Sequence, residues 1–238
     1  MANRRRSTGP SGRFGLCLRW CYSGPRPRVQ EDSLAKLLVG TNNRGKVREY
    51  EELLANLPGA PQITFPAQEG LALEVEESGE TFEANARIKA LAYAQASGLP
   101  SLADDSGLEV DALDGAPGVH SARYAGPGSS DADRYRKLLD ALASVPADQR
   151  SARFRCVVAL ALPDGTVRTA SGTCEGEIGF VPRGEHGFGY DPIFIVAGHG
   201  GRTMAELPPE VKNEISHRAR ALMAIRPVLQ QQMREWKG

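Results

Sequence analysis

The sequence LPSLADDSGLEVDALDGAPG, residues 99–118, runs from a short apolar segment into two adjacent carboxylates, Asp104 and Asp105. This pattern predicts a buried strand that carries acidic side chains at its end. Neighbouring strand residues point to opposite faces, so both aspartates can enter one pocket only if the chain turns there, and Ser106-Gly107 is typical of a turn. We therefore expect Asp105 to be the central carboxylate. An acidic turn without a catalytic role is the alternative, because short motifs often match by chance.

The length and composition are those of an ordinary globular protein. A chain of 238 residues can bury a sizeable core in one large or two small domains without disulfides. Its four cysteines and four histidines lack the spacing of a structural zinc site, and we expect reduced thiols and a cytoplasmic location. The longest apolar run, residues 156–162, is too short to span a bilayer, so we expect no membrane partner.

The charge is distributed unevenly along the chain. Seven of the 29 basic residues are arginines that precede Glu31, the first acidic residue, which leaves 22 basic against 29 acidic residues in the remainder. An acidic body is a poor general nucleic-acid binder, so we expect no stable nucleic-acid partner. We expect residues 1–33 to form a disordered basic extension and residues 34–238 to form one folded domain. Such an arginine-rich leader is also compatible with a transit peptide or with translated sequence upstream of the true start.

Apolar periodicity predicts alternating helices and strands along the body of the chain. Helix 81–97 has the clearest signals, because Gly98 and Pro100 follow it as stop residues. On this helix Asn85 and Lys89 share a face, and they matter to a site only if that face points at the acidic strand end. The expected strands are 35–40, 62–66, 154–162, 166–174 and 193–196, and the other expected helices are 47–57, 131–143 and 217–236.

Between the first strand and the first helix lies a polar turn, residues 41–46. Free amides at a helix N-terminus bind phosphate, and Lys46 adds a positive charge. Residues 40–46 match the G-x-x-x-x-G-K pattern of a P-loop, but Val47 stands where a P-loop needs a Ser or Thr hydroxyl for magnesium. A P-loop ATPase or kinase and a plain strand-to-helix turn both stay as alternatives.

Two later stretches are candidates for binding a flat ligand. The segment GFGYDP, residues 187–192, sets two aromatic residues among glycines beside Asp191, although a bulged strand start would look similar. Ser216 is a plausible N-cap that would place His217 and Arg218 in the first helical turn. Cations there oppose the helix dipole unless they hold an electron-rich group, which indicates a ligand.

Five ordered motifs together resemble the inosine and xanthosine triphosphate pyrophosphatases, enzymes that remove non-canonical purine nucleotides. The resemblance extends from about Leu37 to Ala224. It implies an α/β fold with an elongated mixed β-sheet flanked by helices, an active site in a cleft between two lobes, and a homodimer. The motifs are GTNNRGK (40–46), EESGETFEANARIKA (76–90), LADDSGLEVDALDGAPGVHSARYAG (102–126), GFGYDPIF (187–194) and KNEISHRARAL (212–222).

The resemblance also implies a role for each matching residue. Asp105 would activate water and, with Glu76, bind Mg²⁺, while Glu77 and Asp104 are further candidates for the metal. Thr41, Asn42, Asn43, Arg44, Gly45, Lys46 and Lys89 would hold the triphosphate, and Ser106 would contact the substrate. Phe188, Gly189, Tyr190 and Asp191 would sandwich and read the purine, and Lys212, His217 and Arg218 would donate hydrogen bonds to its 6-oxo edge.

The residue types fit the hydrolysis of ITP, dITP or XTP to the monophosphate and pyrophosphate. This reaction needs water aligned on the α-phosphorus and cations spread over the phosphates. Aspartate is a weak base, so we expect activity that depends on a divalent metal and rises above neutral pH. A Maf-like pyrophosphatase of another nucleotide and an RNA-binding module using the basic extension are the remaining alternatives.

Overall fold

A six-stranded mixed sheet forms the centre of the protein in this computed structural model, which describes residues 36–55 and 61–236. The strand order is β2-β1-β3-β4-β5-β6, with β1 parallel to β2 and β3 and the other pairs antiparallel. The predicted mixed sheet is therefore confirmed. The predicted basic extension, residues 1–33, lies outside the described residues. The strands are β1 (Lys36–Val39), β2 (Gln62–Thr64), β3 (Ser101–Val110), β4 (Ser151–Ala161), β5 (Val167–Ile178) and β6 (Phe194–Val196).

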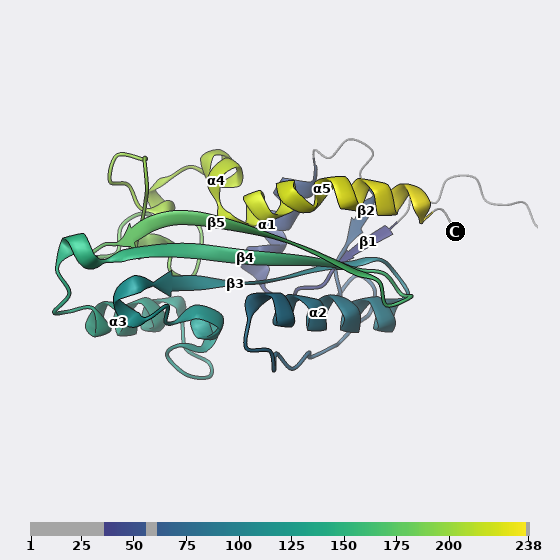
Figure 1. Ribbon diagram of the computed structural model, residues 1–238, viewed down its shortest axis with the longest axis horizontal. Helices are drawn as coiled ribbons and strands as arrows, with labels where there is room; N and C mark the ends of the chain where they lie inside the picture. The colour runs from purple at the N-terminus through teal and green to yellow at the C-terminus, as the bar shows by residue number, and fades with distance from the viewer. Residues whose placement is uncertain (1–35, 56–60, 237–238) are drawn as a thin grey trace, which may run out of the picture. The chain divides into compact units, whose positions relative to one another are not determined.

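Helices cover both faces of the sheet (Figure 1). On one face α2 packs against β3 and β4, and on the other α1 and α5 share an apolar core with β1, β3 and β4. Burial on both faces explains why the central strands are apolar over most of their length. Within the described residues, no helix is both long and apolar enough to cross a membrane. The helices are α1 (Arg44–Ala55), α2 (Phe82–Ser97), α3 (Asp131–Ala141), α4 (Pro209–Ile215) and α5 (His217–Glu235).

The predicted turn at Ser106-Gly107 is wrong. Strand β3 continues through both residues to Val110 and pairs with β4 along its whole length. Gly107 serves close packing instead, because a Cβ at this position would collide with the Gly118 carbonyl and the Ser121 hydroxyl of the 3₁₀ helix η2 (Gly118–Arg123). A small residue in a strand can therefore mark a close backbone approach as well as a turn.

Local capping explains where the helices begin and end. Thr81 caps α2 by accepting a hydrogen bond from the Ala84 amide at 3.1 Å, and Gly98 ends the helix with a φ of 69°. The predicted helix 81–97 and the predicted hairpin of β4 and β5 are confirmed. Helix α1 begins at Arg44 and not at the predicted Val47, and α4 was not predicted.

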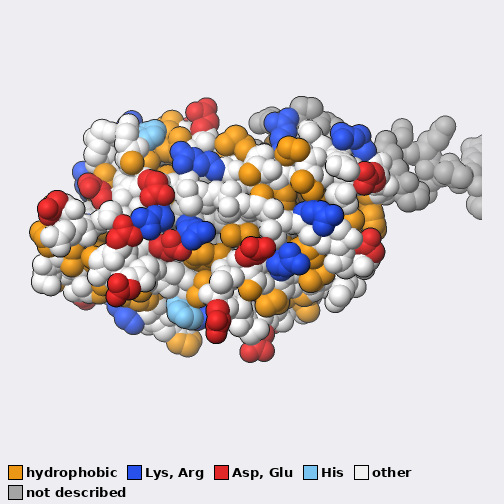
Figure 2. All heavy atoms as spheres, in the orientation of Figure 1, with side chains coloured by type: hydrophobic (Ala, Val, Ile, Leu, Met, Phe, Trp, Pro, Cys, Tyr) orange, Lys and Arg blue, Asp and Glu red, His pale blue; other side chains and the backbone are white. Residues whose placement is uncertain are grey.

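The outer surface over β4 and β5 carries interspersed charges of both signs (Figure 2). Arg153 pairs with Asp111 at 2.9 Å and with Glu175 at 3.1 Å, and Arg155 pairs with Glu109 at 3.4 Å. Exposed pairs of this kind contribute little to stability. Because positive and negative side chains alternate, this face has, within the described residues, no large area of a single charge.

Arg150 is a buried guanidinium that joins three segments of the chain. Its side chain is almost fully buried and donates to the carbonyl oxygens of Ile178 at 2.9 Å, Gly179 at 3.1 Å and Leu142 at 3.1 Å. No carboxylate among the described residues forms an ion pair with it. Arg150 thus supplies donors to buried carbonyl groups at the ends of α3 and β5.

We predict that Arg150→Leu lowers the free energy of unfolding by about 3 kcal/mol, because several buried carbonyl groups lose their donor together. Chemical denaturation followed by circular dichroism measures the change. Arg155→Leu, which removes a partly exposed pair, is the matched control and should stay within about 0.5 kcal/mol of the parent chain. Equal stability of the two variants would contradict the role given to Arg150.

Candidate functional site

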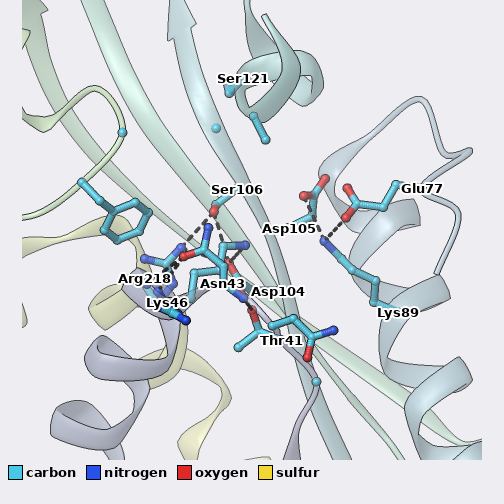
Figure 3. Close-up of a pocket in the computed structure, with 18 of the residues that line it drawn as sticks. Thr41, Asn43, Lys46, Glu77, Lys89, Asp104, Asp105, Ser106, Ser121 and Arg218 are labelled. Atoms are coloured by element: carbon cyan, nitrogen blue, oxygen red, sulfur yellow. Dashed lines mark hydrogen bonds and ion pairs between the residues drawn. The ribbon is translucent and has the colours of Figure 1, made fainter. Parts of the chain in front are cut away.

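A cavity of about 740 Å³ opens beside β3 at the point where β1 ends. Strand β1 reaches only as far as the Val39↔Leu102 pair, and among the described strands none pairs with β3 on that side beyond Leu102. Asp104 and Asp105 therefore both line the cavity, although their side chains lie on opposite faces of the strand (Figure 3). The expectation that a turn is needed to bring both into one pocket is wrong, because the cavity extends around an open strand edge.

Asp104 lies on the face of β3 that packs against α1 and α5. Its Oδ2 atom receives Lys46 Nζ at 2.9 Å, Arg218 Nη2 at 3.1 Å and the Ser106 hydroxyl at 3.1 Å. Burial raises the pKa of Asp104, but Lys46 and Arg218 outweigh it and hold the pKa well below its usual range. Asp104 is thus an ionised group that positions two cations in the cavity.

Asp105 lies on the opposite face and points toward α2. Lys89 Nζ approaches its Oδ1 at 3.2 Å, and Asn85 Nδ2 donates to its Oδ2 at 3.1 Å. The predicted face of α2 with Asn85 and Lys89 is therefore directed at the acidic strand. Burial raises the pKa of Asp105 above its ordinary value despite the opposing effects of Lys89 and Lys46. Such a carboxylate is a better proton acceptor than a free aspartate.

The turn at residues 41–46 lines the cavity, but several of its amides already have partners. Asn43 Oδ1 accepts hydrogen bonds from the Gly45 amide at 2.9 Å and the Lys46 amide at 3.1 Å, and Thr41 Oγ1 accepts from the Asn43 amide at 3.2 Å. This capping explains why α1 begins at Arg44. An anion here would meet side-chain donors and the Lys46 ammonium before it met those amides, which differs from the amide cradle of a P-loop.

Phe188 connects the two ends of the cavity by lying against the first turn of α1. A Cβ added at Gly45 would come within 2.7 Å of Phe188 Cδ1, so the ring requires glycine at this position. The Lys212 ammonium lies 5.0 Å from the ring centroid and the Arg218 guanidinium carbon lies 5.9 Å from it. Cations over an aromatic face are favourable, so Phe188 covers part of the charge cluster.

The segment 187–191 is held at the other end of the cavity from α2. Asp191 is buried and accepts hydrogen bonds from the Phe188 amide at 2.9 Å and from Lys212 Nζ at 2.5 Å. The Tyr190 hydroxyl donates to the Ser121 carbonyl at 2.9 Å, so this hydroxyl is engaged within the protein. Phe188, Gly189, Tyr190 and Asp191 all line the cavity.

Glu49 joins the basic residues behind this segment, and sequence reasoning missed it. Its carboxylate accepts Lys212 Nζ at 2.7 Å and also pairs with Arg218 Nη1. Lys212 is not among the cavity-lining residues and instead supports Asp191 and Glu49 from behind. Glu49 follows Lys46 by three positions on α1, and this spacing on one helix face was the available signal.

His217 and Arg218 open α5 as predicted, with Ser216 as the N-cap that accepts from the Ala219 amide at 3.2 Å. Burial and the neighbouring Arg218 hold the pKa of His217 well below its ordinary value, so the imidazole is neutral near pH 7. It stacks on Phe154 with ring centroids 4.8 Å apart. The expected conflict with the helix dipole is relieved by this neutral state and by the carboxylates around Arg218. Both residues line the cavity.

Two of the neighbouring glutamates, but not Glu76, lie at the cavity. Glu74 and Glu77 line it, and Glu77 Oε1 contacts Lys89 Nζ at 3.0 Å, whereas Glu76 is exposed and does not line it. Within the described ranges no three His, Cys, Asp or Glu side chains form a ligand cluster. Because Lys89 contacts both Glu77 and Asp105, these two carboxylates lie close together in the cavity. Two oxygen donors of this kind fit Mg²⁺, which commonly binds one or two carboxylates together with phosphate oxygens.

The structure brings most of the predicted site residues to one cavity and adds several others. Ser121, Phe154, Asp131 and Arg134 also line it. Ser121 lies within the motif of residues 102–126 but had no predicted role, and the other three lie outside the motifs. The predicted residues that line the cavity are Thr41, Asn42, Asn43, Arg44, Gly45, Lys46, Lys89, Asp105, Ser106, Phe188, Gly189, Tyr190, Asp191, His217 and Arg218, and those that do not are Glu76 and Lys212.

Comparison with known proteins gives consistent matches over the body of the chain. The sequence model of the Ham1 family matches residues 37–228. A dITP/XTP pyrophosphatase of Desulforamulus reducens is 52% identical over 194 residues, covering 82% of this chain and 95% of that protein. A dITP/XTP pyrophosphatase of Bacillus subtilis is 46% identical over 197 residues, covering 83% and 98%. The solved structure of a HAM1 protein from Coxiella burnetii is 44% identical, covers 83% of this chain and 100% of that one, and superposes with a TM-score of 0.73.

We predict that Glu49 makes stability depend on pH in the acidic range. Burial raises the pKa of Glu49, but Arg218 and Lys212 lower it overall from 4.5 to about 2. A lowered folded-state pKa means that the stabilisation is fully present above pH 4.5 and is lost as the pH falls toward 2, by up to about 3 kcal/mol. Denaturant unfolding of the parent chain and of Glu49→Gln between pH 7 and pH 3 measures the difference. Parallel stability curves for the two proteins would contradict it.

Proposed function

This chain belongs to the Ham1 family, and we propose that it hydrolyses the triphosphates of non-canonical purines, dITP, ITP and XTP, to the monophosphate and pyrophosphate. The names of its relatives support this substrate class. The observation that carries the proposal is the pairing of two adjacent carboxylates with two lysines on opposite sides of β3, Asp104 with Lys46 and Asp105 with Lys89, in one cavity. Cations placed around a carboxylate base are what phosphoanhydride hydrolysis needs.

The triphosphate would lie between the first turn of α1 and α2. Lys46 and Lys89 supply charge from the two sides, while Thr41, Asn43 and Arg44 line the cavity between them. Both lysines are paired with carboxylates, so each is already oriented when the phosphates arrive. Preorganised charge of this kind stabilises the transition state without a cost of reorganisation.

Glu77 and Asp105 would hold Mg²⁺, with Glu77 taking the place that the motif gave to Glu76. This assignment rests on the shared contact of both carboxylates with Lys89 and on the exposure of Glu76. When bound, the cation would polarise the phosphate oxygens and make a water molecule more acidic.

Asp105 would accept the proton of the attacking water. The oxygen of this water forms a bond to the α-phosphorus while the bond from that phosphorus to the bridging oxygen breaks and releases pyrophosphate. Asn85 and Lys89 fix the orientation of the Asp105 carboxylate.

The purine would lie beside Phe188, with its 6-oxo edge toward the start of α5. The Arg218 Nε and His217 Nδ1 atoms are buried and have no hydrogen-bond partner within the protein, and both residues line the cavity. A 6-oxo group would give such donors an acceptor, whereas the amino group of adenine would leave them unpaired. Lys212 would act through Asp191, which it contacts.

We also propose a homodimer, as the resemblance to the pyrophosphatase family implies. From the cysteine spacing, the short apolar runs and the acidic body we propose a cytoplasmic location with neither a membrane nor a stable nucleic-acid partner. The charges of both signs over β4 and β5 support the absence of a nucleic-acid surface on that face (Figure 2).

Pyrophosphate release measured side by side on dITP, ITP, XTP, GTP and ATP tests the proposed reaction. We expect turnover of the first three and a rate on ATP that is slower by roughly 10⁴-fold, because ATP leaves buried donors unpaired. Asp105→Asn should lower the rate on dITP by at least about 100-fold. Orthophosphate as the product would support a P-loop NTPase instead, and turnover restricted to other bases would support a Maf-like enzyme.

A chelator should abolish pyrophosphate release, and added Mg²⁺ should restore it. We expect Glu77→Gln to raise the Mg²⁺ concentration needed for half-maximal activity by roughly 10-fold, because one of two carboxylate ligands is lost. Glu76→Gln is the matched control and should change this concentration less than about twofold. Full turnover in chelator would refute the metal requirement. If Glu76→Gln raised the required Mg²⁺ concentration more than Glu77→Gln, Glu76 would be the metal ligand instead.

A further inference from the structure

The segment 187–191, here called the nucleobase loop, donates a hydrogen bond to a residue outside the loop, a contact that no motif predicted. Gly189 has a positive φ of 64° and directs its amide toward α3, where it donates to Asp131 Oδ2 at 2.7 Å. Asp131 precedes Gly189 by 58 positions in the chain. The contact therefore ties the loop to a separate helix that also lines the cavity.

The start of α3 holds the Asp131 carboxylate in place. Ser130 caps the helix in a reciprocal arrangement with Asp133, in which the Asp131 side chain takes no part. Arg134 Nη1 contacts Asp131 Oδ1 at 2.5 Å, and Arg134 Nη2 donates to the Ser129 carbonyl at 2.7 Å. One carboxylate oxygen is thus held by Arg134 while the other is directed at Gly189.

We propose that Asp131 is a positioning residue that fixes the nucleobase loop for purine binding, an inference that rests on the proposed function. Gly189 lies between the two aromatic residues of the loop, Phe188 and Tyr190. Phe188 is held at its amide by Asp191, and Tyr190 is held at its hydroxyl by Ser121. Asp131 holds the glycine between them, so its loss frees the centre of the loop and allows both rings to shift. Asp131 acts through the loop, at a site separate from Asp105.

A purely structural role at the helix start is the competing explanation. An acidic residue in the first turn of a helix stabilises it through the helix dipole, whatever else it contacts. Asp133 also lies in the first turn of α3, carries the same charge and completes the cap of the helix. It has no hydrogen bond to the nucleobase loop. Asp133→Ala is therefore a matched control for Asp131→Ala.

Steady-state pyrophosphate release from dITP, together with inhibition by inorganic tripolyphosphate, tests the proposal. We expect Asp131→Ala to raise the KM for dITP by roughly 5- to 10-fold, the effect of one lost hydrogen bond, with kcat changed less than about twofold. Tripolyphosphate lacks a base, so its inhibition constant should stay within about twofold of the parent value. Asp133→Ala should leave the KM within about twofold.

Amide hydrogen exchange of the ligand-free protein gives a readout that does not depend on activity. We expect exchange at Gly189 to accelerate by roughly 5- to 10-fold in Asp131→Ala and to stay unchanged in Asp133→Ala. Unchanged exchange, an equal change in both variants, or a fall in kcat at constant KM would overturn the proposal. If the parent chain releases no pyrophosphate from dITP, the proposed function fails, and the exchange measurement still decides whether Asp131 fixes the loop.

Discussion

The alternation of side chains along β3 is the constraint on which the site depends. Asp104 and Asp105 are neighbours in sequence and are fixed on opposite faces of one strand. Each therefore meets a different helix, α1 with Lys46 on one side and α2 with Lys89 on the other. Because β1 ends early, the strand edge between the two faces stays open and one cavity reaches both carboxylates. Two charge clusters of different character thus arise from a single dipeptide.

The cluster around Asp104 extends as a continuous set of ion pairs to the nucleobase loop. Arg218 joins Asp104 to Glu49, and Lys212 joins Glu49 to Asp191. Buried charges are costly unless each has a partner, so removal of one member leaves its neighbours uncompensated. This arrangement holds the start of α5 in a fixed position relative to α1. The Asp104 side of the cavity and the nucleobase loop are therefore joined by one continuous set of ion pairs.

Local signals in the sequence were sufficient for much of the fold, and long-range contacts were not. Thr81 and Gly98 mark the ends of α2, and this helix and the β4-β5 hairpin were predicted correctly. Ser106-Gly107 has turn composition but lies within a strand, since the close approach of η2 that requires Gly107 is not visible in the local sequence. Likewise, Glu76 and Glu77 are indistinguishable by composition, and only the position of Lys89 separates them. Glu49 was missed because its partners lie more than 160 positions away along the chain.

The contact between Gly45 and Phe188 has a consequence for protein engineering. The hydrogen atom of Gly45 is all that separates the backbone of the first turn of α1 from the Phe188 ring. Any redesign that enlarges the ring to accept a different nucleotide would press on that backbone, and any side chain introduced at 45 would push the ring away. Positions 45 and 188 cannot be varied independently of each other, so libraries intended to alter base selectivity should randomise both together.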